Sequence, residues 1–343
     1  MFREVLERLE VSTRIDEKKS AAELSTMVAK ITDERILNKI EGVIGGPLLF
    51  KSLNKIFETK QFPSKTEQSI IHFFQGDDAT IDEKLELIRA LKSGMITEIK
   101  EELTSIKGII SKKYSSLAET SFFERFVNFL GDLKDSKDGQ GSTGTGAGEV
   151  LLAMLAKDGK LPDSKGDVYM LGLNVEVKSS QGRLAAFESV DEKFTIDYLQ
   201  KHQIQVPHGS NVSNLQELGA ILIAENDKKK IESFLVDYYT RRAIGKQVES
   251  IVKTSVKKVM KDTWKKPIDF SRSIQIGFGT TAFDSYKKDH GFDTFLMFKE
   301  SKNYLNTSIA IAHSSKKAIN VMNFGMMGMK NGNQPVFSTV KVK

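Results

Sequence analysis

The chain has 343 residues and no cysteine, which excludes disulfides, thiolate zinc sites and cysteine nucleophiles. Its formal net charge is +6, and its pI of about 9.1 lies in the range typical of nucleic-acid-binding proteins. No apolar run is long enough to cross a bilayer and the chain opens on a charged segment, so we expect no membrane, no signal peptide and a cytoplasmic protein. The length favours two domains.

The first part of the chain shows apolar residues at helical spacing almost throughout. Two Ser/Thr-x-x-Glu patterns, which begin at Ser64 and Thr80, are capping boxes, and each predicts the start of a helix. Another helix is expected over 96–110, and a stripe of phenylalanines predicts a last one over 122–130. We interpret residues 1–133 as a helical domain for DNA contact, partner docking or oligomerisation, for instance as a homodimer.

Residues 134–147 are rich in glycine, serine, lysine and aspartate, a composition typical of a flexible linker. No Gly-Lys-Ser/Thr follows the glycines and no predicted strand precedes them, so a nucleotide-binding loop is rejected. Residues 148–343 then form the second domain.

A predicted β-hairpin is the most informative feature of this second domain. A short apolar run follows Asp167, turn residues that include Gly172 interrupt it, and a second run spans 174–178. Side chains at positions i and i+2 of a strand share one face, so Glu176 and Lys178 are expected side by side, while the neighbouring valines face a core. Asp167 is expected within reach of both.

Two carboxylates beside a lysine form a unit with defined chemistry. Carboxylate oxygens suit Mg²⁺, which prefers one or two protein carboxylates, several waters and phosphate oxygens, and Mn²⁺ is expected to substitute for it. The lysine would orient or help to deprotonate a metal-bound water, or offset charge that builds up on a phosphate. An ion pair on an ordinary hairpin is the alternative.

At these residues the sequence resembles the PD-(D/E)XK nuclease superfamily, which has the restriction-endonuclease-like fold. The resemblance implies that Asp167 and Glu176 bind the metal and that Lys178 is the catalytic lysine. It also implies that Glu149, at the start of a predicted helix, supplies the further carboxylate that a preceding helix often contributes in that family.

One position departs from the family pattern. Gly166 stands where the pattern has a proline, whereas Asp163 does follow a proline. Asp163 is therefore the second choice for the first metal ligand.

Small polar residues and an arginine follow the lysine. Ser180, Gln181 and Arg183 are placed to touch a phosphate backbone, and an ordinary exit from strand to loop is the alternative.

The segment 241–266 is the most basic in the chain. Lys253, Lys257 and Lys261 recur at four-residue spacing on the side opposite an apolar stripe. Like charges at that spacing oppose each other in a helix, and a polyanion would relieve the repulsion. We therefore predict contact with a DNA backbone, weakened by salt, over a simple solvated face.

The remaining elements are read from shorter patterns. Strands are predicted at 218–224, 273–278, 294–298, 308–312 and 336–342, with a short helix over 282–289. Strands with helices between them on a central sheet fit the suspected fold.

The sequence thus predicts an α+β or α/β protein with an all-helical N-terminal domain and a restriction-endonuclease-like mixed-sheet domain flanked by helices. The expected function is that of a metal-dependent DNA nuclease. The alternative is a nuclease-fold structural or DNA-binding component of a viral particle, such as a phage, or of a packaging assembly, in the host cytoplasm or virion.

Overall fold

A computed structural model of the protein describes residues 49–133 without 102, 148–162, 166–179, 184, 187, 188, 190–299, 303–326 and 335–339, with side chains to residue 318. The helices predicted before residue 49 and the predicted linker 134–147 lie outside the described residues. So do four predicted site residues, Asp163, Ser180, Gln181 and Arg183.

Helices form the first described part of the chain. A helix over 49–60 is followed by α4 (Ser64–Gly76), α5 (Ile81–Ser93) and α7 (Ser121–Asp132). The capping box at Thr80 is confirmed, because its side chain accepts from Glu83 N and the Glu83 side chain accepts from Thr80 N. The one predicted at Ser64 is wrong, since α4 is preceded by Pro63 and has no side-chain cap.

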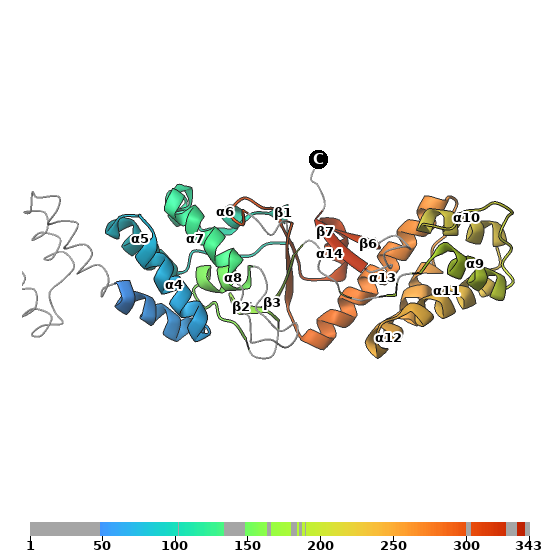
Figure 1. Ribbon diagram of the computed structural model, residues 1–343, viewed down its shortest axis with the longest axis horizontal. Coiled ribbons are helices and arrows are strands. Elements are labelled where there is room, and N and C mark those ends of the chain that lie inside the picture. Colours follow the sequence, from blue (N-terminus) through green and yellow to red (C-terminus); the bar gives the residue numbers. More distant parts are fainter. Residues whose placement is uncertain are drawn as a thin grey trace, which may run out of the picture.

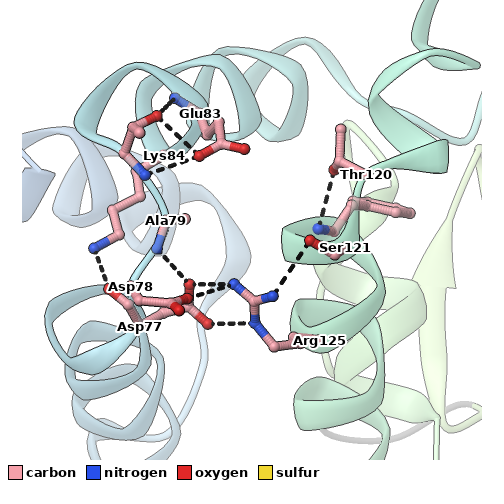
Figure 2. A network of polar contacts seen from close by, with 10 residues as sticks. Asp77, Asp78, Ala79, Glu83, Lys84, Thr120, Ser121 and Arg125 are labelled. Carbon is pink, nitrogen blue, oxygen red and sulfur yellow. Dashed lines mark hydrogen bonds and ion pairs between the residues drawn. The ribbon is translucent and has the colours of Figure 1, made fainter.

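An ionic network joins the turn between α4 and α5 to α7 (Figure 2). Arg125 Nε and Nη2 donate to the two carboxylate oxygens of Asp77 at 2.8 and 2.7 Å, and Nη2 also contacts Asp78 Oδ1 at 2.9 Å. Lys84 donates to the Asp77 carbonyl at 2.6 Å. A bidentate arginine therefore fixes the position of α7 against the two preceding helices.

The helix predicted over 96–110 is wrong. The segment instead contains β1 (Leu103–Thr104) and one turn of helix, α6 (Ile106–Ile109), and two 3₁₀ turns follow, Lys112–Tyr114 and Leu117–Glu119. Ile96 N donates to Leu155 O, and Ile96 forms bridges with Ala156 and Ile110. These long-range backbone bonds hold the chain extended where its local pattern favours a helix.

A five-stranded sheet with the order β1-β5-β4-β3-β2 lies at the centre of the molecule (Figure 1). Its other strands are β2 (Val168–Met170), β3 (Leu173–Ser179), β4 (Thr294–Phe298) and β5 (Ile309–Ala312). Strands β3 and β4 are parallel, and the other neighbours are antiparallel. The strands predicted at 294–298 and 308–312 are therefore confirmed.

The predicted hairpin is β2–β3. Its turn is made by Leu171 and Gly172, which both have positive φ, at 54° and 74°. Two consecutive residues with positive φ match the twist of a tight hairpin. The carboxylate of Asp158 accepts from both of their backbone N–H groups, at 2.7 and 3.0 Å.

The two faces of the sheet pack against different elements. One face carries Val175, Val177, Leu296 and Ile309 and shares a single hydrophobic cluster with the N-terminal helices and with α8 (Glu149–Leu155). The other face carries Phe295 and Met297 and packs against the end of α13 (Pro267–His290). After β5 come α14 (Ser315–Val321) and a two-stranded sheet of β6 (Met322–Met326) and β7 (Pro335–Thr339).

A helical insertion separates β3 from its parallel neighbour β4. It consists of α9 (Glu192–Lys201), α10 (Leu215–Glu225), α11 (Lys228–Arg242), α12 (Lys246–Val259) and the larger part of α13. These helices have a hydrophobic cluster of their own. Figure 1 shows them at the end of the molecule opposite α4 and α5, with α13 running back to the sheet.

Two strand predictions in this insertion are wrong. The run 218–224, expected as a strand, belongs to α10, which begins where the Asn214 side chain accepts from Gln216 N and Glu217 N. The run 273–278, also expected as a strand, belongs to α13, and the helix predicted over 282–289 is confirmed as the later part of that longer helix. A short apolar run has no periodicity that separates a buried strand from a buried helix.

The mixed α+β class is confirmed. Among the described residues, no helix is long and apolar enough to cross a membrane.

Candidate active site

Strand β3 places Glu176 and Lys178 on one face of the sheet, as predicted. Glu176 lies beside Phe295 and Lys178 beside Met297 of the parallel strand β4. Val175 and Val177 point into the core on the opposite face. Because side chains alternate along β3, its carboxylate and its ammonium lie together on the face that α13 covers.

Asp167 joins them from the residue that precedes β2. Its backbone N–H donates to Val175 O at 2.9 Å. Its Oδ2 accepts from Val177 N at 2.8 Å and from Lys178 Nζ at 3.1 Å. The hairpin pairing thus orients this carboxylate toward β3, and the predicted trio of Asp167, Glu176 and Lys178 is one cluster.

The residue before Asp167 is a glycine whose backbone excludes a proline. Gly166 has a φ of 65°, and a Cβ atom there would lie 3.0 Å from Val175 O. Its N–H donates to His290 O at 3.3 Å. Proline has neither a positive φ nor an N–H, so this backbone requires glycine.

Lys178 lies between the two carboxylates. Its ammonium forms ion pairs with Asp167 Oδ2 and with Glu176 Oε1. Glu176 Oε1 also accepts from the hydroxyl of Tyr286 on α13 at 3.0 Å. The side chains of Asp167 and Lys178 are 24% and 23% exposed, so solvent reaches the cluster from their side, whereas that of Glu176 is 2% exposed.

This environment shifts the ionisation of each group. Burial and the nearby Asp167 carboxylate raise the pKa of Glu176 above its ordinary value. Burial disfavours the charged form of Lys178, but the Asp167 and Glu176 carboxylates outweigh that effect and raise its pKa. Burial raises the pKa of Tyr286 to about 12. At neutral pH Lys178 is therefore an ammonium and Tyr286 a neutral hydrogen-bond donor.

The donor set fits a divalent cation. Asp167 and Glu176 both contact one ammonium nitrogen, so their oxygens converge on one region of space. Two converging carboxylates with solvent access match the preference of Mg²⁺ for few protein ligands and several waters. Burial is the main cause of the raised pKa of Glu176, and the Asp167 carboxylate adds to it; a cation bound between the two carboxylates would offset that second effect.

The third predicted ligand lies on another element. Glu149 begins α8, and the six residues that follow it in this helix are buried in the cluster on the opposite face of the sheet. Within the part of the chain that the structure describes, no three Asp, Glu, His or Cys side chains form a metal-binding group.

The predicted DNA-binding lysines lie in the helical insertion. Lys253 and Lys257 are exposed on α12, and Lys261 is exposed just beyond the end of that helix. The opposite side of α12 is buried and contains the predicted apolar stripe, Val248, Ile251, Val252, Val256 and Val259.

Tyr286 is the site residue that the sequence does not reveal. It lies 110 positions from Glu176, in a stretch whose local pattern indicates only a helix. No spacing between the two residues signals their contact, which depends on how α13 returns to the sheet.

A comparison of the chain with protein-family models, with curated proteins and with solved structures finds no match.

Proposed function

We propose that this protein is a metal-dependent nuclease with a restriction-endonuclease-like fold, which hydrolyses phosphodiester bonds in DNA. The observation that carries the proposal is the cluster of Asp167, Glu176 and Lys178, formed by a hairpin on a central sheet and open to solvent on one side. A helix with Glu149 at its start precedes the hairpin, as in the pattern of the suspected family.

Asp167 and Glu176 would hold Mg²⁺, or Mn²⁺ in its place, with Glu149 contributing through a bound water. A bound divalent ion acidifies water and polarises phosphoryl oxygens. In the reaction a water oxygen forms a bond to phosphorus while the bond from phosphorus to the leaving oxygen breaks.

Lys178 would act through its charge. In the protein without a metal ion, the Asp167 and Glu176 carboxylates outweigh the effect of burial and raise the pKa of Lys178, so the side chain is an ammonium at neutral pH. Its ammonium is suited to stabilise negative charge on the phosphoryl oxygens in the transition state and to orient the attacking water.

DNA would be held by its backbone. Lys253, Lys257 and Lys261 extend from the helical insertion, and Arg183, Ser180 and Gln181 follow the catalytic strand. A lysine contacts a phosphate as a point charge, so this contact adds affinity for DNA without a preference for its sequence. A homodimer through the N-terminal helices would place two such sites for a double-strand cut.

A second candidate function is DNA binding without cleavage, as in a component of a viral particle or packaging assembly. The observation that favours it is the closed ion-pair arrangement, in which Lys178 contacts both carboxylates and Glu176 is almost fully buried.

Cleavage of supercoiled and linear plasmid DNA in Mg²⁺, Mn²⁺ or EDTA separates the two. Wild type is compared with Asp167→Asn and Lys178→Ala, and with Lys107→Ala as a control that breaks a lysine–carboxylate pair elsewhere, the Lys107–Glu119 pair at 2.9 Å. If the protein is a nuclease, wild type and Lys107→Ala cut DNA when a metal ion is present, whereas Asp167→Asn and Lys178→Ala do not. DNA binding without cutting in either metal would favour the second function.

A further inference from the structure

Helix α13 belongs to two different packing environments. Phe270, Ile274 and Phe278 lie in the hydrophobic cluster of the helical insertion. One turn further on, Phe283 belongs to the cluster on the sheet face that carries Glu176, and Tyr286 packs against it. A single helix of 24 residues therefore reaches from the insertion to the candidate active site (Figure 1).

Tyr286 lies over the cluster of Asp167, Glu176 and Lys178. Its hydroxyl donates to Glu176 Oε1 at 3.0 Å, and its ring centroid lies 5.7 Å from Lys178 Nζ. The ring also stacks on His290, with centroids 3.9 Å apart and an interplanar angle of 24°. This stacking restricts the orientation of the ring, and with it that of the hydroxyl.

The end of α13 is tied to the segments around the site. The carbonyl of His290 accepts from Gly166 N at 3.3 Å, directly beside Asp167. Lys287 Nζ donates to the carbonyls of Asp293 and His313, at 3.0 and 2.6 Å. Asp293 lies just before β4, and His313 lies just after β5. These bonds fix the last turn of α13, and with it Tyr286, relative to both strands.

We infer that Tyr286 is a positioning residue for Glu176, an inference that rests on the proposed nuclease function. The Glu176 carboxylate takes its orientation from two donors, Lys178 on its own strand and Tyr286 on α13. The phenol adds no charge, so it holds the carboxylate without competing with a cation for it. Hydrogen bonds from groups behind a metal ligand typically contribute tenfold or more to metal affinity.

The test compares Tyr286→Phe with Tyr304→Phe in the full chain. Tyr286 is half-buried, and the control residue Tyr304 is a buried phenol in the cluster on the opposite face of the sheet, where its ring contacts Phe298. Mn²⁺ affinity is measured by calorimetry without DNA, and plasmid cleavage is measured over a range of Mg²⁺ concentrations. The loss of the Tyr286 hydroxyl is expected to weaken Mn²⁺ binding and raise the half-saturating Mg²⁺ concentration about tenfold each, with little change in Tm. Tyr304→Phe is expected to match wild type in both.

A double-mutant cycle separates positioning from a general effect on the fold. If Tyr286 acts through Glu176, Tyr286→Phe has no further effect on Mn²⁺ affinity once Glu176→Gln is present, whereas a purely structural role gives additive losses. Additive losses, or a Tyr286→Phe variant with wild-type Mn²⁺ affinity in a protein that cuts DNA, overturn the inference and leave the proposed function intact. A wild type that neither binds Mn²⁺ nor cuts DNA overturns both.

Discussion

Gly166 shows how one backbone position fixes the candidate site. It combines a positive φ with a donor bond to His290 and a close approach to Val175, and Asp167 takes its direction from that geometry. A proline at this position would disrupt that geometry, because it has neither a positive φ nor an N–H.

We predict that Gly166→Ala costs more stability than Gly172→Ala. A positive φ alone costs a residue with a Cβ about 1–2 kcal/mol. Gly172 is a matched control, because its φ is 74° and a Cβ atom there would meet nothing within 4 Å. At Gly166 the contact with Val175 adds to the strain, so its variant should also lose DNA cleavage. Chemical unfolding and plasmid cleavage check this, and equal effects of the two substitutions would contradict it.

Lys60 is a buried amine outside the site. It is 1% exposed and donates to the carbonyls of Ala156 and Lys157, where α8 ends. Burial lowers its pKa from 10.5 to about 8, partly opposed by the nearby Asp158 carboxylate. The folded protein therefore releases this proton at a lower pH than the unfolded chain.

The stability of wild type relative to Lys60→Met is accordingly expected to rise with pH. Between about pH 8 and 10.5 the unfolded state binds the proton that the folded state has lost, so raising the pH removes a cost of burying the charge. From pH 7 to pH 10 the gain in unfolding free energy is on the order of 2 kcal/mol. Urea unfolding at several pH values measures it, with the exposed Lys55→Met as control. If the difference in unfolding free energy between wild type and Lys60→Met does not change with pH, the lowered pKa of Lys60 is wrong.

Among the elements, α7 is fixed to the α4–α5 turn by one arginine (Figure 2). The hydrogen bonds from Arg125 hold the pKa of Asp77 below its ordinary value. A lowered carboxyl pKa contributes stability that is present above the unfolded pKa of about 3.8 and is lost as the pH falls through the folded value.

Replacing Arg125 with methionine should therefore destabilise the protein most at neutral pH. The arginine side chain is 42% exposed, so solvent screens the interaction, and we expect a loss of about 1 kcal/mol at pH 7 that shrinks toward pH 3. Thermal unfolding across this pH range, with the exposed Arg89→Met as control, provides the measurement. A loss that grew in acid would show that the ionic network is not responsible.

The exposed lysines on α12 and just beyond its end are expected to contribute to the salt dependence of DNA binding. Each phosphate contact adds about one to the slope of log affinity against log salt. Changing Lys253, Lys257 and Lys261 to glutamine should reduce that slope by up to about 3 and weaken binding to all DNA sequences alike. A triple change of Lys51, Lys55 and Lys65, exposed on the first described helices, is the control. If the slope stays the same, α12 is a solvated face.

The elements that the sequence predicts are those whose signals are local. The β2–β3 hairpin has a tight turn and alternating side chains, and α5 and α7 have caps and clear apolar stripes. By contrast, α10 and the middle of α13 are buried on several sides, which removes the amphipathic pattern that marks a helix. The 96–110 segment takes its form from partners at Leu155 and β5, which no local pattern specifies.

The hydrophobic clusters of the protein follow the sheet rather than the order of the sequence. The N-terminal helices and one sheet face share a core, although the predicted linker lies between them in the chain, and β1 from that N-terminal part pairs with β5. The hairpin supplies three of the candidate site residues and could be predicted. Tyr286 could not be, because a long insertion lies between it and Glu176.

Single-turnover cleavage of a labelled duplex in Mg²⁺ measures whether Asp167, Glu176 and Lys178 form a site that hydrolyses phosphodiester bonds. Lys178→Met is compared with wild type and with Lys107→Met, and duplex binding is measured in EDTA. We predict that Lys178→Met binds the duplex as wild type does but cuts it about 10²- to 10³-fold more slowly, the loss typical of one group that stabilises transition-state charge. If Lys178→Met cuts the duplex at the wild-type rate, Lys178 is not a catalytic residue and the proposed nuclease site is wrong.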